Sequence, residues 1–451
     1  MAGPEEGAAG PRRELGLFDS VCIIVGIIVG SGIFGTPSIV AGCVPGPWGV
    51  IGVWIAGGLL SLAGALCYAE LAGAYPRQGG ECVYLARAFG RWAGHLFGWA
   101  EMFVIIPGGI ASVSLIFADY FGPLAGLPKG AGRFVAAGAV AALTAVNLAG
   151  VRQGKWTQNV LTVVKAAGLL MVGAVALFAR GAAPSAGSGS FSMDGLGLAL
   201  ILVLFTYGGW RDIVFVAAEV RDPRRNFVRT MLAGVGAVTA LYVLVNAAFL
   251  KVLGPVGMGA SKAVAVDTVA AVFPAGAERV VAALVCLSAL GSANGLVFTG
   301  ARVSYAMGTG HRPLGFLGLW HPRRGVPPAA LIVQGLLSVA VVLALGSFAE
   351  AVLYSTPVVW TFYFAAGASV FILRRKDPGV ERPYRVTAYP VTPVLFCASC
   401  AYLVYSSVTY AVRMKYMGPL VAIGVVLAGL LFYGITEGRR GAVPPGPDRG
   451  P

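Results

Sequence analysis

The chain has 451 residues, of which 57% are hydrophobic and only 12% are charged, and its mean hydropathy is +0.80. A soluble domain carries about twice that charged fraction, so the composition excludes a disordered chain, a coiled coil and an ordinary cytosolic enzyme. The net charge of +14 comes from basic residues in short connections between apolar runs, which indicates membrane topology rather than a nucleic-acid partner.

Residues 1–15 are polar, with an acidic pair and no apolar centre, which argues against a cleaved signal peptide and predicts a cytoplasmic tail. After them come twelve apolar stretches long enough to cross a bilayer as helices. They cover residues 17–42, 47–74, 93–121, 133–150, 157–180, 196–219, 230–254, 278–307, 328–346, 350–373, 388–411 and 416–435. The sequence therefore predicts an all-α membrane protein with twelve transmembrane helices.

The basic residues orient these spans. With the N-terminus inside, 24 of the 33 Lys and Arg residues fall on the cytoplasmic side, 8 fall outside and Lys165 lies within a span. This bias predicts a multi-pass protein of the cell membrane with both termini in the cytoplasm. The last residues, 438–451, form a second cytoplasmic tail.

Three further features concern the connections and the cysteines. Residues 79–91 are amphipathic and too short to cross, so we expect a helix along the inner surface. Residues 254–276 could hold short helices over an outer mouth. Nearly all of the seven cysteines lie in or beside apolar runs, and the pair Cys397 and Cys400 has no second pair, which favours helix packing over a metal or redox site.

Two glycine clusters are the most informative feature. The first span contains Gly30-Ser31-Gly32 near its middle, and the sixth contains Phe205-Thr206-Tyr207-Gly208-Gly209-Trp210. A helix broken at mid-depth must line a cavity, because lipid cannot satisfy the exposed backbone groups. Glycines also serve close helix packing. Two clusters at corresponding positions of spans 1 and 6 instead favour an inverted-repeat transporter, in which each of these spans is the first helix of its half. The free N–H groups and carbonyls at such breaks suit a zwitterion, and thus an α-amino acid.

At these residues the chain resembles the amino acid–polyamine–organocation superfamily, and most closely its L-type amino acid transporter branch. The resemblance runs from about Gly16 to Gly434. Its further motifs are Ala218-Glu219-Val220, Pro223-Arg224-Arg225-Asn226, Gly291-Ser292-Ala293-Asn294-Gly295 with Arg302, and Glu381-Arg382-Pro383. It implies the leucine-transporter-like fold, a 5+5 inverted repeat with residues 16–180 and 181–375 as its halves, followed by two C-terminal helices in residues 376–437.

The resemblance also implies a central substrate site. Ser31 and Gly32, with Gly30 beside them, resemble the carboxylate cradle. Carbonyl partners of the ammonium are implied in both broken spans, and residues at the side-chain end are implied in two others, the third and the tenth. The implied carbonyl partners are Ile27, Ile28, Phe205, Thr206 and Gly208, and the implied side-chain contacts are Pro107, Ile110 and Trp360. Phe205 resembles the aromatic gate over the substrate; its alternative is an aromatic ring packed between helices.

Lys165 is the one cation placed inside a span, and such a group is a functional hypothesis by default. It resembles the fifth-span lysine that replaces a sodium ion in this family. Two roles compete, a proton carrier and a permanently charged tether between helices 1 and 5, and snorkelling is a third reading. Sodium coupling is disfavoured under both main readings.

The sequence departs from the branch at two places. Arg211 stands where many members have Asn, and either pairs with Asp212 or Glu219 or touches substrate. Residues 121–133 lack the cysteine that links animal members to a heavy subunit, so no disulfide-linked heavy subunit is expected and a free-standing, prokaryotic transporter follows.

The acidic residues bear on the substrate. No Asp or Glu falls near the predicted site, and Glu101 and Glu219 lie towards inner helix halves, so neutral substrates are favoured over cationic ones. We therefore expect a secondary transporter of neutral L-amino acids by alternating access, through exchange or, alternatively, proton symport. An enzyme is disfavoured because no catalytic constellation lies within the spans, a channel would show no counterflow, and no cofactor or metal is expected.

Overall fold

The computed structural model describes residues 21, 25, 28–75, 80–128, 130–149, 167–175, 178–179, 192–210, 223–273, 276–310, 312–321 and 324–437. Seven helical runs in these ranges are long and apolar enough to cross a membrane. They are α3 (Gly46–Ala74), the run of α5 (Arg91–Ala100), η1 (Glu101–Ile105) and α6 (Ile106–Leu124), α11 (Pro223–Ala260), α13 (Ala277–Gly310), α15 (Phe348–Lys376), α16 (Val391–Arg413) and α17 (Gly418–Glu437).

Four shorter apolar helices accompany them: α2 (Gly32–Cys43), α7 (Gly132–Leu148), α9 (Met193–Thr206) and α14 (Pro328–Ala344). The described residues contain no β-strand, only an isolated bridge between His321 and Val326. The predicted all-α membrane class is therefore confirmed, whereas the count of twelve spans stays a prediction.

The expected connecting helices are present. The segment predicted to lie along the inner surface contains α4 (Glu81–Phe89), and the predicted outer connection contains α12 (Val264–Ala270). The kink that separates this connection from the preceding span is at Gly254, whose φ of 67° lies in the left-handed region, and Pro255 follows it. A seven-residue 3-10 segment, η4 (Arg312–Gly318), follows α13.

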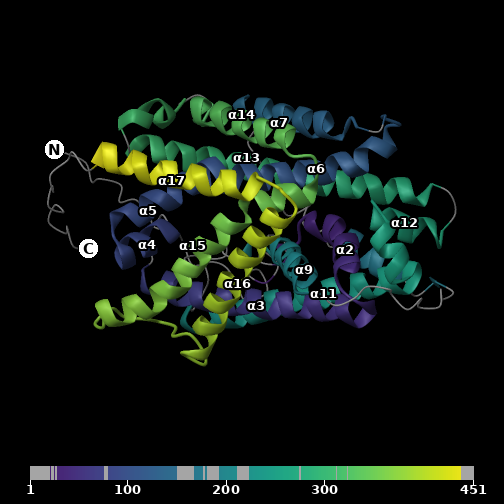
Figure 1. Cartoon of the computed structure of the whole chain (residues 1–451), viewed down its shortest axis with the longest axis horizontal. Helices are drawn as coiled ribbons and strands as arrows, with labels where there is room; N and C mark the ends of the chain where they lie inside the picture. Colours follow the sequence, from purple (N-terminus) through teal and green to yellow (C-terminus); the bar gives the residue numbers. More distant parts are fainter. Residues whose placement is uncertain are drawn as a thin grey trace, which may run out of the picture.

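The helices form layers around two short ones (Figure 1). In this view α3 and α11 run along the lower edge, α6 and α13 lie above them, and α7 and α14 form the upper edge. Between the lower and the middle layers lie α2 and α9, which contact each other, and α2 contacts both α11 and α6. The two helices that begin or end at the glycine clusters are therefore enclosed by longer ones.

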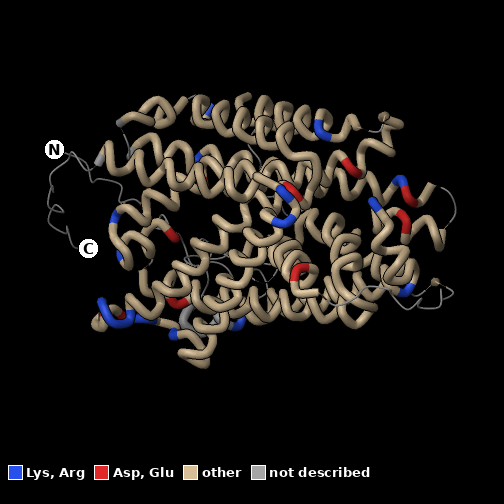
Figure 2. Tube along the Cα trace, in the orientation of Figure 1, with Lys and Arg blue, Asp and Glu red and all other residues tan. Residues whose placement is uncertain are grey.

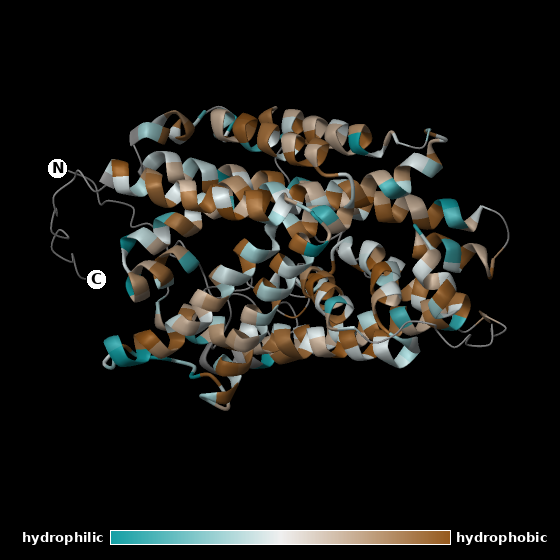
Figure 3. Cartoon of the chain, viewed as in Figure 1, coloured by the Kyte–Doolittle hydropathy of each residue, from teal (hydrophilic) through white to brown (hydrophobic). Residues whose placement is uncertain are grey.

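Hydrophobic residues cover the outside as well as the inside of this assembly (Figure 3). Leu336 on α14, Tyr405 on α16 and Leu431 on α17 are each about two-thirds exposed. Such a surface is the reverse of a soluble protein's and suits contact with lipid. Helix α17 is the least covered of the seven long runs.

One end of the bundle holds a buried charged cluster. Glu70 near the end of α3 is 2% exposed and accepts hydrogen bonds from Arg374 Nε at 2.7 Å and Nη2 at 2.5 Å. Arg382 lies 3.5 Å from the same carboxylate, and the Val386 N–H donates to it at 2.6 Å. The charges are thus paired and hydrogen-bonded, as burial requires.

A second ion pair adjoins this cluster. Asp377, directly after α15, accepts from Arg87 Nε of α4 at 2.6 Å and from the Tyr75 hydroxyl at 2.8 Å. The hydrogen bond from Arg87 holds the pKa of the Asp377 carboxyl below its ordinary value. Lys376 Nζ donates to the Arg87 carbonyl at 2.8 Å, so α4 is fastened to the end of α15, where Figure 2 shows a basic segment.

Candidate functional site at two broken helices

The break predicted in the first span is present. Val29 and Gly30 are not helical, and α2 begins only at Gly32, with Ser31 as its N-cap residue. The first backbone N–H groups of a helix have no acceptor within that helix, and the helix dipole places a partial positive charge there. The start of α2 therefore presents donors and positive potential in the protein interior.

The break predicted in the sixth span is also present. Helix α9 ends at Thr206, and Tyr207 to Gly209 form a turn. Gly209 has a φ of 100°, and a Cβ on Gly208 would lie 2.8 Å from the Phe205 carbonyl oxygen. Both positions of the turn therefore need glycine. Backbone N–H groups of the turn donate to the Val203 and Phe205 carbonyls, and the Thr206 carbonyl, at the negative end of the helix dipole, has no donor within the helix.

The start of α2 touches the end of α9. A Cβ built on Gly32 would lie 3.0 Å from Thr206 Oγ1 and 3.2 Å from its Cα, so a side chain here would push the two helices apart by a few tenths of an ångström. The hydroxyls of Thr36 and Thr206 are 2.7 Å apart, and the Thr206 hydroxyl also donates to the Leu202 carbonyl at 2.9 Å. The two breaks therefore form a single junction.

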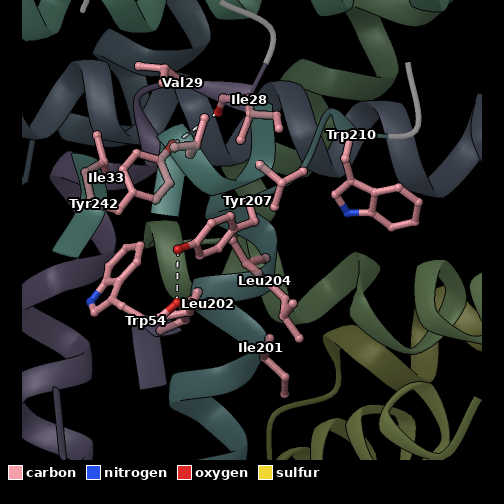
Figure 4. Packing of buried hydrophobic residues seen from close by; sticks show 14 of the residues in the cluster. Ile28, Val29, Ile33, Trp54, Ile201, Leu202, Leu204, Tyr207, Trp210 and Tyr242 are labelled. Atoms are coloured by element: carbon pink, nitrogen blue, oxygen red, sulfur yellow. Dashed lines mark hydrogen bonds between the residues drawn. The ribbon is translucent and has the colours of Figure 1, made fainter. Parts of the chain in front are cut away.

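Tyr242 of α11 joins the carbonyls of both breaks. Its hydroxyl lies 3.2 Å from the Ile28 carbonyl oxygen (Figure 4) and 3.3 Å from the Thr206 carbonyl oxygen. Its ring contacts Trp54 of α3 and Tyr207, with centroids 5.4 and 5.1 Å apart. Tyr207 in turn donates to the Trp54 carbonyl at 2.9 Å. A rigid aromatic wall thus positions the hydroxyl at the junction.

Sequence reasoning missed Tyr242. A signal existed, because a tyrosine near the middle of an apolar span needs an acceptor for its hydroxyl. The partners could not be identified from the sequence, since Ile28 lies 214 residues away along the chain.

Ser31 carries an unused polar atom at the junction. The side chain is 1% exposed, and its Oγ has no hydrogen-bond partner among the residues that the structure describes. A methyl group built on Gly30 would lie 4.0 Å from Ser292 Oγ on α13, so this helix also borders the break. A buried hydroxyl without a partner is costly, and a bound molecule at the junction would relieve that cost.

The described groups that border the junction are polar but uncharged. The described residues that border it contribute hydroxyls and backbone groups, from Ser31, Thr36, Thr206, Tyr242 and Ser292. The N-terminus of α2 suits an anionic group and the C-terminal carbonyls of α9 suit a cationic one. A small zwitterion matches both ends at once.

The expected gate residue lies beside the junction. Phe205 is half-buried, and its ring packs against Phe348, the first residue of α15, with centroids 5.6 Å apart. A Cβ on Gly35 of α2 would lie 3.3 Å from the Phe348 ring and 3.0 Å from Ile116 of α6. Four helices therefore meet tightly on this side of the breaks.

Trp360 belongs to an aromatic cluster that begins at the second break. Its ring lies 5.2 Å from that of Tyr363 on α15, and Tyr363 lies 5.3 Å from Trp210, which follows the turn. Tyr68 of α3 contacts both Tyr363 and Trp210. Trp360 is thus connected to the junction through other rings, and its direct contact with substrate stays a prediction.

Pro107 and Ile110 lie on α6, where it packs against α15. Pro107 lacks the N–H that would bond the Phe103 carbonyl, and the Tyr354 hydroxyl of α15 lies 3.5 Å from that oxygen. The preceding residues form the π-helical segment η1. Ile110 is fully buried in a hydrophobic cluster separate from that of Ile28. Their place at the side-chain end of the substrate stays a prediction.

Several predicted residues lie outside the described part of the chain: Ile27, Lys165, Arg211, Asp212 and Glu219. Within the described ranges, no group of three or more His, Cys, Asp or Glu side chains could hold a metal ion. The six cysteines in those ranges are free thiols.

Comparisons with known proteins match residues 15–432 to the family described as amino acid permease. The chain is 31% identical to the b(0,+)-type amino acid transporter 1 of Mus musculus over 94% of this chain and 87% of that protein. It is 29% identical to the serine/threonine exchanger SteT of Bacillus subtilis (strain 168), over 95% and 98%. It is 32% identical to the large neutral amino acids transporter small subunit 2 of Homo sapiens, over 88% and 77%.

Proposed function

Because this chain belongs to the amino acid permease family, whose members are transporters rather than enzymes, we propose that it exchanges neutral L-amino acids across the membrane by alternating access. The observation that carries the proposal is the Tyr242 hydroxyl, which lies within hydrogen-bonding distance of the carbonyls of both helix breaks. Two broken helices held at one point inside a multi-pass membrane protein are typical of a transporter site.

The substrate lies, in this proposal, across the junction. Its carboxylate occupies the start of α2, bound by the Ser31 hydroxyl and the N–H groups of Gly30 and Gly32. The unused Ser31 Oγ supports this placement. Its ammonium faces carbonyls of the two broken spans, and its side chain points towards α6 and α15. The proposed ammonium partners are Ile27, Ile28, Phe205, Thr206 and Gly208, and the proposed side-chain contacts are Pro107, Ile110 and Trp360.

The substrate class follows from charge. A cationic side chain in this interior needs a carboxylate partner, and the described residues that border the junction are uncharged. The names of two relatives support the same class, since one is a serine/threonine exchanger and another a large neutral amino acids transporter. The first of these names also favours exchange over proton symport.

Phe205 is the proposed gate. Its contact with Phe348 lies at the start of α15, whereas the last turn of that helix carries Arg374, Arg375 and Lys376. The positive-inside rule puts this basic end in the cytoplasm, so the Phe205 side faces outward and is closed. Transport then requires the contact to open on the outer side as the inner side closes.

The wider architecture is part of the same proposal. Residues 16–180 and 181–375 form two inverted repeats of five helices, residues 376–437 add two more, and residues 1–15 and 438–451 are cytoplasmic tails. The protein lies in the cell membrane and acts without a disulfide-linked heavy subunit.

Uptake by proteoliposomes tests the proposal. Radiolabelled L-serine, L-alanine and L-leucine are offered with or without unlabelled amino acid inside and with or without an inward proton gradient, and L-arginine is the control for charge. If the protein is an exchanger, uptake of a neutral amino acid should require internal substrate and should not depend on the proton gradient. Lys165 would then act as a tether. Gradient-driven uptake into empty vesicles would instead show proton symport and direct attention to Lys165; uptake of arginine alone would contradict the substrate class.

A further inference from the structure

An apolar cavity of about 380 Å³ lies away from the junction, between α4, α5, α15, α16 and α17. Phe89, Trp92, Thr361, Ala365 and Leu427 are among its lining residues, none of which belongs to α2 or α9. The Thr361 hydroxyl donates to the Pro357 carbonyl at 2.6 Å, so its polar group is already satisfied. Such a wall offers nothing to water or to a polar solute and favours a hydrocarbon occupant.

The cavity opens toward the bilayer. Leu427 is 56% exposed and Trp92 is 43% exposed, and α17, which forms one wall, is the least covered long helix. Because these residues belong to membrane-spanning runs, their exposed sides face lipid. A hydrocarbon chain can therefore enter sideways from the membrane.

The α15 wall of the cavity lies at the depth of the hydrocarbon core. It extends from Ala365 to Pro357, eleven to nineteen positions before Lys376 at the basic end, which is about 16–28 Å along a helix. The hydrocarbon core of a bilayer is about 30 Å thick. This wall thus lies at the depth of acyl chains when the end of α15 lies at the depth of headgroups.

The headgroup end is positively charged. Arg91 directly precedes Trp92 of the cavity wall, Arg87 lies in the last turn of α4, and α15 ends in Arg374, Arg375 and Lys376. Asp377 is the acidic residue paired with Arg87. Figure 2 shows basic segments at the ends of both α4 and α15, on the same side of the molecule. Arg374 is paired with Glu70, so these five basic residues exceed the two acidic partners, and the net positive charge attracts a phosphate.

We propose that this cavity is a binding site for an anionic phospholipid, with one acyl chain between α5, α15 and α17 and the phosphate beside Arg91 and Arg87. The occupant fastens α17 to the remainder of the bundle. This inference depends on the protein spanning a membrane and is independent of what the junction transports.

Native mass spectrometry of the purified protein tests the site. The protein is reconstituted in vesicles with equal phosphatidylglycerol and phosphatidylcholine, extracted, and measured for retained lipid. We expect one phosphatidylglycerol per chain. Ala365→Trp, which fills the cavity, should remove it, and the smaller Ala365→Leu should weaken it. Leu336→Trp on α14, where the side chain is 65% exposed, is the matched control and should retain the lipid.

The headgroup contact has its own variants. Arg91→Gln should lower the preference for phosphatidylglycerol over phosphatidylcholine about fivefold, since a basic residue near an anionic membrane surface contributes about 1 kcal/mol. Arg91→Lys keeps the charge and should keep the preference. The proposal is overturned by no retained lipid, by equal retention of both lipids, by equal loss in the control, or by a second copy of the chain in place of lipid.

Discussion

Two buried polar clusters in this apolar protein differ in how completely they are satisfied. Around Glu70, both carboxylate oxygens are occupied by guanidinium groups and a backbone N–H. At the junction of α2 and α9 the groups are uncharged, and Ser31 Oγ has no partner among the described residues. A cluster whose polar atoms all have hydrogen-bond partners stabilises the fold, whereas a cluster with an unpartnered polar atom is suited to bind a ligand.

This difference predicts separate effects on stability and on transport. Changes around Glu70 should lower stability in proportion to the charge that they leave unpaired. Changes at the junction should affect substrate more than fold, except where they push α2 away from α9.

The largest expected effect comes from Glu70→Gln. The substitution keeps the size of the side chain but leaves the Arg374 and Arg382 guanidinium groups without their carboxylate. Losing one partner of a buried ion pair costs about 3–5 kcal/mol, and we expect the lower end because Arg374 is 21% exposed. Reversible unfolding in mixed micelles measures this loss in the free energy of unfolding. Asp194→Asn, which breaks the exposed pair with Arg413, is the control and should cost less than about 1 kcal/mol; equal losses would contradict the assignment.

Tyr242→Phe should lower the free energy of unfolding by about 1–3 kcal/mol, because carbonyls of both breaks lose a buried donor. The same substitution should also reduce amino acid uptake. Tyr207→Phe is the matched control. It removes one bond to the Trp54 carbonyl, which lies inside α3 and keeps its helical donor. If Tyr207→Phe impaired uptake as strongly as Tyr242→Phe, the hydroxyl at the junction would have no special role.

Gly32→Ala should lower the free energy of unfolding by about 1 kcal/mol through overpacking, because its methyl group would lie 3.2 Å from the Thr206 Cα. Gly30→Ala has more room, with no atom closer than 3.9 Å. We expect it to unfold at the wild-type temperature yet to lose uptake, because the methyl group occupies the proposed carboxylate site. Thermal unfolding and uptake measured on the same two preparations separate these outcomes; normal uptake by Gly30→Ala would argue against the cradle.

The smallest effect concerns pH and Asp377. Its pKa is lowered by the hydrogen bond from Arg87, so its contribution to stability is present above the ordinary value near 4 and is lost as pH falls through the lowered value. Because Arg87 is 44% exposed, the pair contributes about 0–1 kcal/mol. Asp377→Asn should therefore lower stability slightly at pH 7 and flatten its acid dependence below pH 4. An unchanged acid dependence would exclude this group.

The sequence predicted some of these features because their causes are local. Glycine clusters determine where α2 begins and α9 ends, and an amphipathic segment determines α4. The pairing of Glu70 with Arg374 and Arg382 was not predictable, because each partner lies about 300 residues away and Arg382 was recognised only as part of a motif. The same holds for Tyr242, whose acceptors belong to two other helices, and for the apolar cavity, which is formed by five helices.

The central claim is that the junction binds the amino acid, and uptake by the Ser31→Leu variant tests it most directly. The larger side chain should fill the start of α2 and abolish uptake of labelled neutral amino acid into proteoliposomes loaded with unlabelled substrate. Thermal unfolding of the same preparation verifies that the protein is folded. Lost uptake with wild-type unfolding is the predicted result, and retained uptake by a folded Ser31→Leu protein would contradict the account.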